Sequence, residues 1–386
     1  GSALSGTGAD NVGIIFNADT DLMSGTLQFI GTGGGGGEGH GILFSGGATT
    51  AMTGSLVYSG DGGPSSGRGV SVSGSAGDFT CATLGSCDIT FMGNSSPGAV
   101  SGNIGALISG VSITDFSLID ITGTSTAASM SCHGLVLNDV VLGGTAALDG
   151  SASSVTSSHG IHVNGLVRAA GDGDVTYTAT SAGGQAGILV NGINSQPDNS
   201  KSGTIVYQSD ILFGDSTSTL MFGLGPYDLM FTGLDVSGTL SATTAGDITF
   251  QPADYTVSGG SGSLYFNANE IFMAETSFTA LSGSSLAFDA PINFIAPSGM
   301  FDFDGSGSPS ISTEGMTSAG SITVSAFGAA FHLGGTVTAG TLLVTAPVAQ
   351  TTIDASSISS SGPVLFASPV DFVYGAANTL LITASS

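Results

Sequence analysis

Basic side chains are almost absent from this sequence of 386 residues. Arg68, Arg168 and Lys201 are its three basic residues, against 28 aspartates and glutamates, so the formal net charge is −25. Proteins bind nucleic acid largely by neutralising its phosphates with lysine and arginine, and anionic membranes attract clusters of the same residues. The composition therefore excludes a nucleic-acid partner and disfavours an anionic membrane surface.

Tryptophan, helical periodicity and long apolar runs are missing as well. No stretch approaches the roughly 20 apolar residues of a membrane-spanning helix, so we expect no membrane span in this segment. Glycine, serine and threonine are too dense for stable helices, and no helical period persists. The chain begins Gly1-Ser2 without a basic and apolar leader, which predicts a mature or excised segment.

Cysteine is scarce, with three residues in the chain. Cys81 and Cys87 are six positions apart, a spacing that allows a disulfide across a loop. Cys132 would then be the remaining cysteine. Three buried free thiols are the alternative, and the sequence leaves both open.

A five-residue phrase, by contrast, occurs seven times in the first half of the chain. Each copy consists of glycine, an apolar residue, a variable residue, a second apolar residue, and asparagine or serine. From Gly13 to Gly187 six steps cover 174 residues, a mean period of 29. A fixed period in this range indicates stacked supersecondary units. The copies are residues 13–17, 41–45, 69–73, 105–109, 134–138, 160–164 and 187–191.

Alternation within the phrase predicts a β-strand with one buried face. Stacked copies then form two apolar columns, a polar column whose asparagine amides bond from one repeat to the next, and a following glycine suited to positive φ. The first apolar column is Ile14, Ile42, Val70, Ala106, Leu135, Ile161 and Ile188. The second is Phe16, Phe44, Val72, Ile108, Leu137, Val163 and Val190.

A second strand with an aromatic residue accompanies most copies, as in residues 26–29, 55–58 and 88–91. From about residue 210 the phrase changes, which divides the chain into residues 1–209 and a continuation, 210–386. We expect steps of 16 to 22 residues there, with one step of 36 that hides a degenerate repeat near Met300-Phe301. The units are residues 247–250, 263–266, 285–288, 321–324, 341–344 and 363–366.

These patterns predict an all-β parallel β-solenoid, an elongated rod. The rival is an antiparallel sandwich or barrel, which has no reason to repeat one residue type at one offset. Residues 237–242 leading into residues 246–250 resemble the repeats of filamentous-haemagglutinin-type adhesins and autotransporter passengers. That resemblance implies a right-handed parallel β-helix on a bacterial surface, and it transfers no functional residue.

Histidines provide one candidate site. His40, His133 and His159 each precede a phrase glycine, as Arg68 does in another copy. His133 and His159 belong to consecutive repeats, so we expect neighbouring imidazoles that lower each other's pKa. With Cys132 they are a candidate zinc or copper site. The alternative is a partly exposed polar column without metal.

Acidic residues provide the other candidates. Asp302 and Asp304 share one strand face, which fits the two carboxylates of a glycosidase. The alternative is a solvated strand face or a weak cation site. Against catalysis, tryptophan is absent and basic residues are rare. The glycine-rich run 31–39 opens no helix and is interpreted as a loop. We interpret the further acids as residues in turns or at strand starts, and a Ca²⁺ site is the alternative. They are Asp19, Asp21, Asp172, Asp174 and Asp247.

The sequence thus predicts a non-enzymatic extracellular or cell-surface structural protein: an adhesin shaft, surface fibre or filament subunit. No catalytic, cofactor-binding or metal-binding residue is assigned, and no cofactor is expected. Neither end shows a charged or helical cap, so head-to-tail self-association is expected, with host or surface glycans as other partners. The alternative is a β-helix like a phage tailspike that binds or cleaves polysaccharide.

Overall fold

The computed structural model consists of two compact units, Gly1–Leu212 and Phe213–Ser386, each built from β-strands. In the part of the chain that it describes, no helix is long and apolar enough to cross a membrane. The described residues are 11–35, 38–65, 67–74, 76–96, 102–126, 129–154, 157–182, 187–191, 193–194, 203–209, 211–213, 219–220, 227–231, 234–236, 239–251, 254–257, 263–273, 276–280, 285–294, 298–305, 310–318, 321–327, 330–345, 351–353, 355, 357–367, 370–372 and 381–384.

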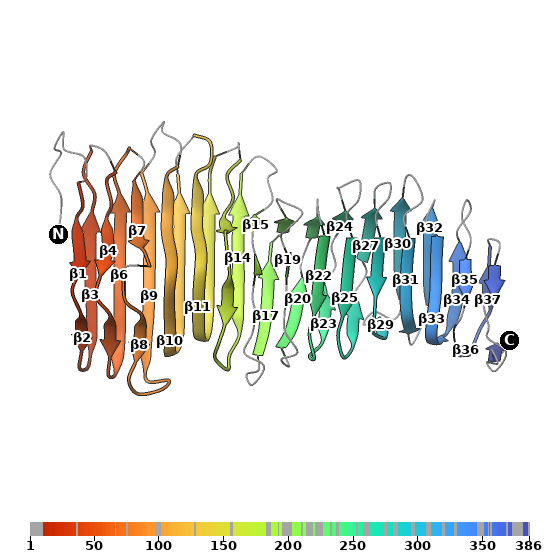
Figure 1. The fold of residues 1–386 in the computed structure, drawn as a ribbon. Helices are drawn as coiled ribbons and strands as arrows, with labels where there is room; N and C mark the ends of the chain where they lie inside the picture. The colour runs from red at the N-terminus through yellow and green to blue at the C-terminus, as the bar shows by residue number, and fades with distance from the viewer. Residues whose placement is uncertain are drawn as a thin grey trace. The chain divides into compact units, whose positions relative to one another are not determined.

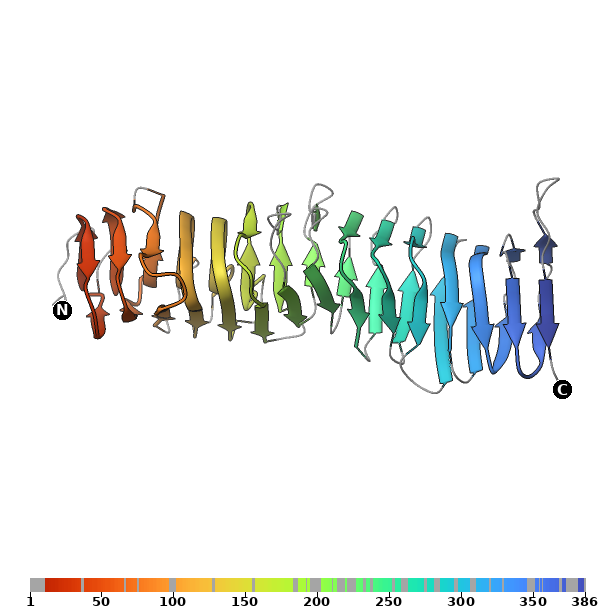
Figure 2. The same cartoon turned by 90° about the horizontal axis from the view of Figure 1, so that it is seen from below.

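The first unit is a stack of coils (Figures 1 and 2). Most coils have three strands, whereas two consist of one long strand each, β10 and β11. Every strand pairs in parallel with its counterpart one coil later, as β1 does with β4, β2 with β5 and β3 with β6. The parallel β-solenoid is thereby confirmed, whereas the short middle strand of the coils, such as β2 or β5, was not predicted. In order, the strands are β1 (Ile14–Asn17), β2 (Thr20–Leu22), β3 (Thr26–Thr32), β4 (Ile42–Gly46), β5 (Thr49–Ala51), β6 (Gly54–Gly62), β7 (Arg68–Val72), β8 (Phe79–Cys81), β9 (Cys87–Ser95), β10 (Ile104–Ser125), β11 (His133–Ala152), β12 (Ile161–Val163), β13 (Val167–Ala169), β14 (Val175–Ser181), β15 (Ile188–Val190), β16 (Ile193–Asn194) and β17 (Gly203–Gln208).

Both predicted apolar columns are confirmed by the strand register. Ile14 pairs with Ile42, which pairs with Val70, and the series continues to Ile188. Beside them, aromatic rings of the phrase strands and the third strands stack from coil to coil. The ring centroids of Tyr58 and Phe91 are 5.3 Å apart, for example. Buried aromatic stacking of this kind adds stability beyond area burial, about 1 kcal/mol per pair.

The polar column is confirmed only in part. Nδ2 of Asn138 donates to Oγ of Ser109, as the prediction of side-chain bonds between coils requires. Ser45 and Ser73 instead donate from their hydroxyls to carbonyl oxygens of the preceding coil.

The glycine that opens each phrase has a structural role that the sequence reasoning missed. A Cβ on Gly69 would lie 2.1 Å from the backbone nitrogen of Asn94, and one on Gly134 would lie 2.4 Å from that of Ser151. Two strands of the coil therefore approach backbone to backbone, and we call this contact the glycine seam. Its members are Gly41, Gly69, Gly105 and Gly134, which face Gly60, Gly93, Gly123 and Gly150.

The glycine after the phrase adopts positive φ at Gly110 (66°) and Gly165 (126°), as predicted. The prediction is wrong for Gly74, whose φ is not positive, and in the second coil it is wrong by one residue, because Gly47 rather than Gly46 has positive φ (83°). The cause is a register shift after Phe16, where Asn17 pairs with Gly46 and the bend is displaced.

The second unit repeats the construction with shorter coils, 19 to 25 residues apart by register. The predicted series of residues 247–250 followed by 263–266 is wrong, because Ile248 pairs with Ile271 and Leu264 with Leu286. The step of 16 residues therefore joined two faces of the solenoid. The hidden repeat near Met300-Phe301 is confirmed in part. It is β30 (Ser298–Gly305), in which Met300 pairs with Thr323, but Ser285 pairs with Ser310, so the step of 36 residues also joined two faces.

The remaining strands follow the same parallel order. They are β18 (Ile211–Phe213), β19 (Thr219–Leu220), β20 (Tyr227–Phe231), β21 (Leu234–Val236), β22 (Thr239–Thr243), β23 (Ile248–Phe250), β24 (Asp254–Val257), β25 (Ser263–Asn267), β26 (Ile271–Met273), β27 (Thr276–Ala280), β28 (Ser285–Phe288), β29 (Ile292–Phe294), β31 (Ser310–Thr317), β32 (Ser321–Phe327), β33 (Ala330–Ala339), β34 (Thr341–Thr345), β35 (Thr351–Ile353), β36 (Ser357–Ser360), β37 (Val364–Phe366), β38 (Val370–Phe372) and β39 (Leu381–Ala384).

Cys81 and Cys87 form a disulfide that closes the loop between β8 and β9, while Cys132 is free and buried. We expect replacement of both bridged cysteines by alanine to cost about 2 kcal/mol of stability, since the bridge closes a short loop. Urea unfolding with and without reductant measures the effect. Reduction should lower the wild-type midpoint and leave that of the double variant unchanged; equal wild-type midpoints would contradict the prediction.

Candidate functional site

A groove of about 500 Å³ lies at a corner of the first unit, where successive coils have corners of unequal length. In β10 the register shifts between Thr114 and Leu118, which pair with Gly143 and Thr145 of β11. Three residues of β10, Asp115 to Ser117, therefore oppose the single Gly144 of β11. The longer corner protrudes, and the short glycine corner beside it becomes the floor of the groove.

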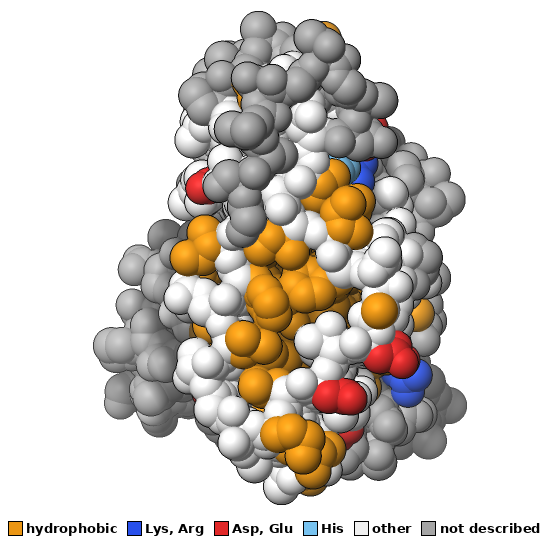
Figure 3. All heavy atoms as spheres, turned by 90° about the vertical axis from the view of Figure 1, so that its left-hand side faces the viewer, with side chains coloured by type: hydrophobic (Ala, Val, Ile, Leu, Met, Phe, Trp, Pro, Cys, Tyr) orange, Lys and Arg blue, Asp and Glu red, His pale blue; other side chains and the backbone are white. Residues whose placement is uncertain are grey.

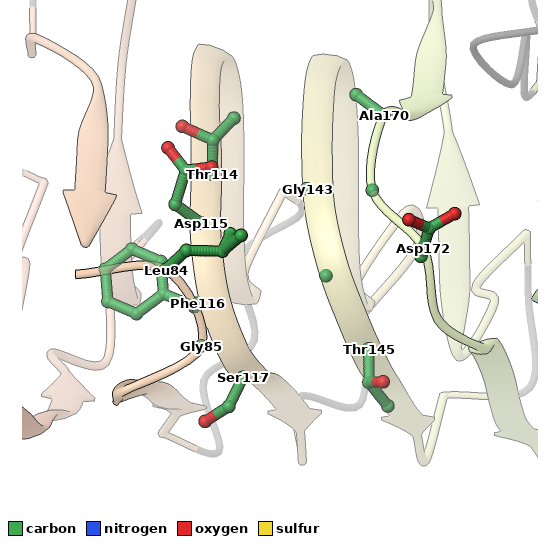
Figure 4. A pocket seen from close by; sticks show the side chains of 12 residues that line it. Leu84, Gly85, Thr114, Asp115, Phe116, Ser117, Gly143, Thr145, Ala170 and Asp172 are labelled. Carbon is green, nitrogen blue, oxygen red and sulfur yellow. The ribbon is translucent and has the colours of Figure 1, made fainter. Parts of the chain in front are cut away.

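Figure 4 shows how the walls are arranged around this floor. Thr114, Asp115 and Ser117 lie on one side of Gly143, and Ala170 and Asp172 lie on the other. Leu84, from the loop that the disulfide closes, extends the first wall and is 79% exposed.

Backbone contacts hold the first wall in place. Asp115 has φ of 68°, a left-handed conformation that aspartate tolerates better than most residues. Its carbonyl oxygen accepts a hydrogen bond from the N–H of Gly85 (3.0 Å), which ties the disulfide loop to the bulge. Phe116 is 2% exposed and anchors the bulge in the core. The hydroxyl of Ser117 donates to the carbonyl oxygen of Cys87 (2.9 Å) and to the carboxylate of Asp88.

The chemistry of the groove is that of hydrogen-bond acceptors. Among the described residues that line it, Asp115 and Asp172 provide carboxylates, Thr114, Ser117 and Thr145 provide hydroxyls, and none is basic. Such a lining accepts bonds from hydroxyl or ammonium groups and repels phosphate or sulfate. Sequence reasoning interpreted Asp172 as a turn residue and passed over Asp115; the uneven spacing of the phrases was the available signal.

A second cluster consists of three histidines in adjoining coils. The prediction that His133 and His159 are neighbours is confirmed, with ring centroids 5.9 Å apart. His162 of β12, which the sequence reasoning did not include, is nearer still, at 4.6 Å from His133. Burial, followed by the neighbouring imidazoles, lowers the pKa of His133 to about 3 and that of His162 to about 4.

Two imidazole nitrogens of this cluster are hydrogen-bonded to protein groups. Nδ1 of His133 accepts the backbone N–H of His159 (3.2 Å), and Nε2 of His162 is hydrogen-bonded to the side-chain amide of Asn191. Cys132, the third proposed ligand, donates its backbone N–H to Oγ of Ser158. Among the residues that the structure describes, no three His, Cys, Asp or Glu side chains are placed to hold one metal ion.

No family model, curated protein or solved structure matches this chain. The assignment of the fold therefore rests on the strand register itself. The resemblance to filamentous-haemagglutinin-type adhesins remains a resemblance of repeat style.

The other predicted positions have mainly structural contacts. His40 is buried with Nε2 3.4 Å from a carboxylate oxygen of Glu38, and Arg68 donates to Oγ of Ser71. Asp19 and Asp174 are turn acids as predicted, because each carboxylate accepts a backbone N–H of the following coil, from Ala48 and Thr204. Asp247 accepts a bond from the amide of Asn269, and Asp21 is exposed in β2.

Asp302 and Asp304 lie in β30, where their backbone pairs with Ser277 and Thr279 of β27. Their side chains lie outside the described residues. The proposal of a carboxylate pair therefore stays a prediction.

Proposed function

We propose that this chain is a non-enzymatic structural protein, a β-solenoid that forms the shaft of an extracellular adhesin, surface fibre or filament. The observation that carries this proposal is the parallel stacking of successive coils among the described strands of each unit. Backbone hydrogen bonds and buried columns run along each stack, so that force applied along it is shared by many bonds. Solenoids of this kind are stabilised by the contacts between neighbouring repeats.

The Cys81–Cys87 disulfide supports an extracellular location. Disulfides persist in oxidising compartments and are rare where glutathione and thioredoxin keep thiols reduced. The second candidate, a polysaccharide-binding β-helix, is favoured by the acceptor-lined groove.

Self-association through a strand edge is part of the proposal. Among the described strands, β1, β2 and β3 pair on one side only, with β4, β5 and β6. Figure 3 views this face and shows hydrophobic side chains gathered in its middle. A strand edge that pairs on one side only among the described strands, next to apolar side chains, favours pairing with a further coil, here one from a second copy.

Sedimentation velocity over a range of concentrations, with electron microscopy of the same samples, tests the association. We expect concentration-dependent, linear assembly by the wild type and monomers from an Ile15→Glu, Ile30→Glu double variant, because charges on an edge oppose pairing. Both isoleucines are exposed, at 54% and 57%. Met130→Glu, at another exposed apolar position, is the control and should assemble normally. A monomeric wild type at high concentration would rule out the association.

A further inference from the structure

We propose that the corner groove binds an uncharged oligosaccharide through one or two pyranose rings. The site is separate from the strand edge, so it does not depend on whether the chain assembles. Its volume of about 500 Å³ lies within the range of small-molecule sites.

Acceptors converge on the groove from both walls. The carboxylates of Asp115 and Asp172 lie on opposite sides of the floor at Gly143 (Figure 4). Sugar hydroxyls donate hydrogen bonds, and bonds to an ionised acceptor are roughly twice as strong as neutral ones. The hydroxyl of Thr145 can both donate and accept, so it can also accept a hydrogen bond from a sugar hydroxyl or donate one to it.

The floor and the apolar wall suit the faces of a sugar ring. Gly143 and Gly144 have no side chains, so a ring can approach the backbone closely. Leu84 and Ala170 offer apolar surface to the C–H face of a pyranose. Leu84 is 79% exposed, so its apolar surface is in contact with water. Contact with a sugar ring would remove that surface from water, which is favourable.

Charge selects the kind of saccharide. The described lining contains two carboxylates and no basic residue, in a chain of net charge −25. Sulfated, sialylated or uronic-acid chains would place a further anion against these carboxylates without a cation to pair it. Uncharged sugars avoid that repulsion.

A cationic side chain of a partner protein is the rival occupant. A lysine or arginine would use the carboxylates but leave the hydroxyls and Leu84 without a matching group. Ring-shaped ligands with both hydroxyls and an apolar face use the whole lining. The wall is also held in advance by the disulfide, the Gly85–Asp115 bond and buried Phe116, which reduces the entropy lost on binding.

The test uses saturation-transfer NMR and calorimetry with uncharged tetrasaccharides of glucose, galactose, mannose and N-acetylglucosamine. At least one should bind, with an affinity that is unchanged in high salt. Asp172→Ala and Asp115→Asn should each weaken binding roughly tenfold, the value of one charge-assisted bond. Thr145→Lys should abolish it, because the exposed lysine would fill the groove and pair with both carboxylates. Asp21→Ala removes the same charge outside the groove and should bind as the wild type does.

Three outcomes would overturn the proposal. The first is that no tetrasaccharide of the panel binds. The second is binding that Asp172→Ala and Thr145→Lys leave unchanged. Both positions are exposed, and native circular dichroism would show that the variants are folded. Unchanged binding would then exclude the groove as the binding site. The third is that a trilysine peptide binds in a salt-sensitive manner while the sugars do not, which assigns the groove to a cationic peptide.

Discussion

Replacing Gly69 with alanine is expected to destabilise the first unit strongly, because the added methyl group would collide with the backbone. The new Cβ would lie 2.1 Å from the backbone nitrogen of Asn94 and 2.5 Å from the carbonyl oxygen of Gly60. Both contacts are backbone atoms of strands held in register, β9 and β6, so no side chain can rotate away. Overpacking typically costs about 1 to 3 kcal/mol, and we expect at least the upper value here.

Urea unfolding of Gly69→Ala and of a matched control measures this effect. Gly74→Ala adds the same methyl group five residues further on, where the nearest atom, the carbonyl oxygen of Gly110, is 3.4 Å away. Gly74 is exposed, so its substitution should change stability by no more than about 1 kcal/mol. Equal midpoints for the two variants would show that the glycine seam tolerates a side chain.

Lowering the pH from 7 toward 4 is expected to destabilise the first unit through its histidine cluster. In the unfolded chain histidine titrates near its ordinary pKa of about 6.5, whereas folding lowers the pKa of His133 to about 3 and of His162 to about 4. Below about pH 6.5 the unfolded state therefore binds protons that the folded state does not. Stability is complete above that pH and falls as the pH decreases toward the folded-state values, by a few kcal/mol in total.

The slope of the unfolding free energy between pH 7 and pH 5 checks this prediction. His162→Leu should reduce the slope, because it removes one titrating ring and the repulsion that ring exerts on His133. Leucine suits the site, since Val136 and Leu189 occupy the same column one coil before and after.

His332→Thr is the control, because Thr352 follows His332 in register one coil later and the variant leaves the cluster intact. Its slope should equal that of the wild type. An unchanged slope in His162→Leu would exclude the cluster as the source of acid sensitivity.

The columns of the first unit were predictable because strand periodicity and repeat offset together determine register. Ile42 and Phe44 occur at constant offsets from a glycine, and their counterparts recur at the same offsets, so stacking places each above the next. The short middle strand of the coils was missed because segments such as Thr20–Leu22 are three residues long, too short to show alternation. In the second unit, similar tetrapeptides lie on different faces, and similarity alone cannot tell faces apart.

The candidate site was the least predictable part. The three residues Asp115 to Ser117 form a wall only because the neighbouring coil has a single Gly144 at that corner, a comparison that requires the register. Likewise His162 is three residues from His159 in sequence, but its contact with His133 depends on the stacking of two coils.

By itself, then, the sequence determined the architecture: strands in parallel coils and two apolar columns. These follow from local periodicity, which needs no knowledge of neighbours in space. Tertiary structure alone decided the disulfide, the glycine seam, the histidine trio and the groove. Each of these depends on distances between residues in different strands or coils, and those distances are set only when the coils stack.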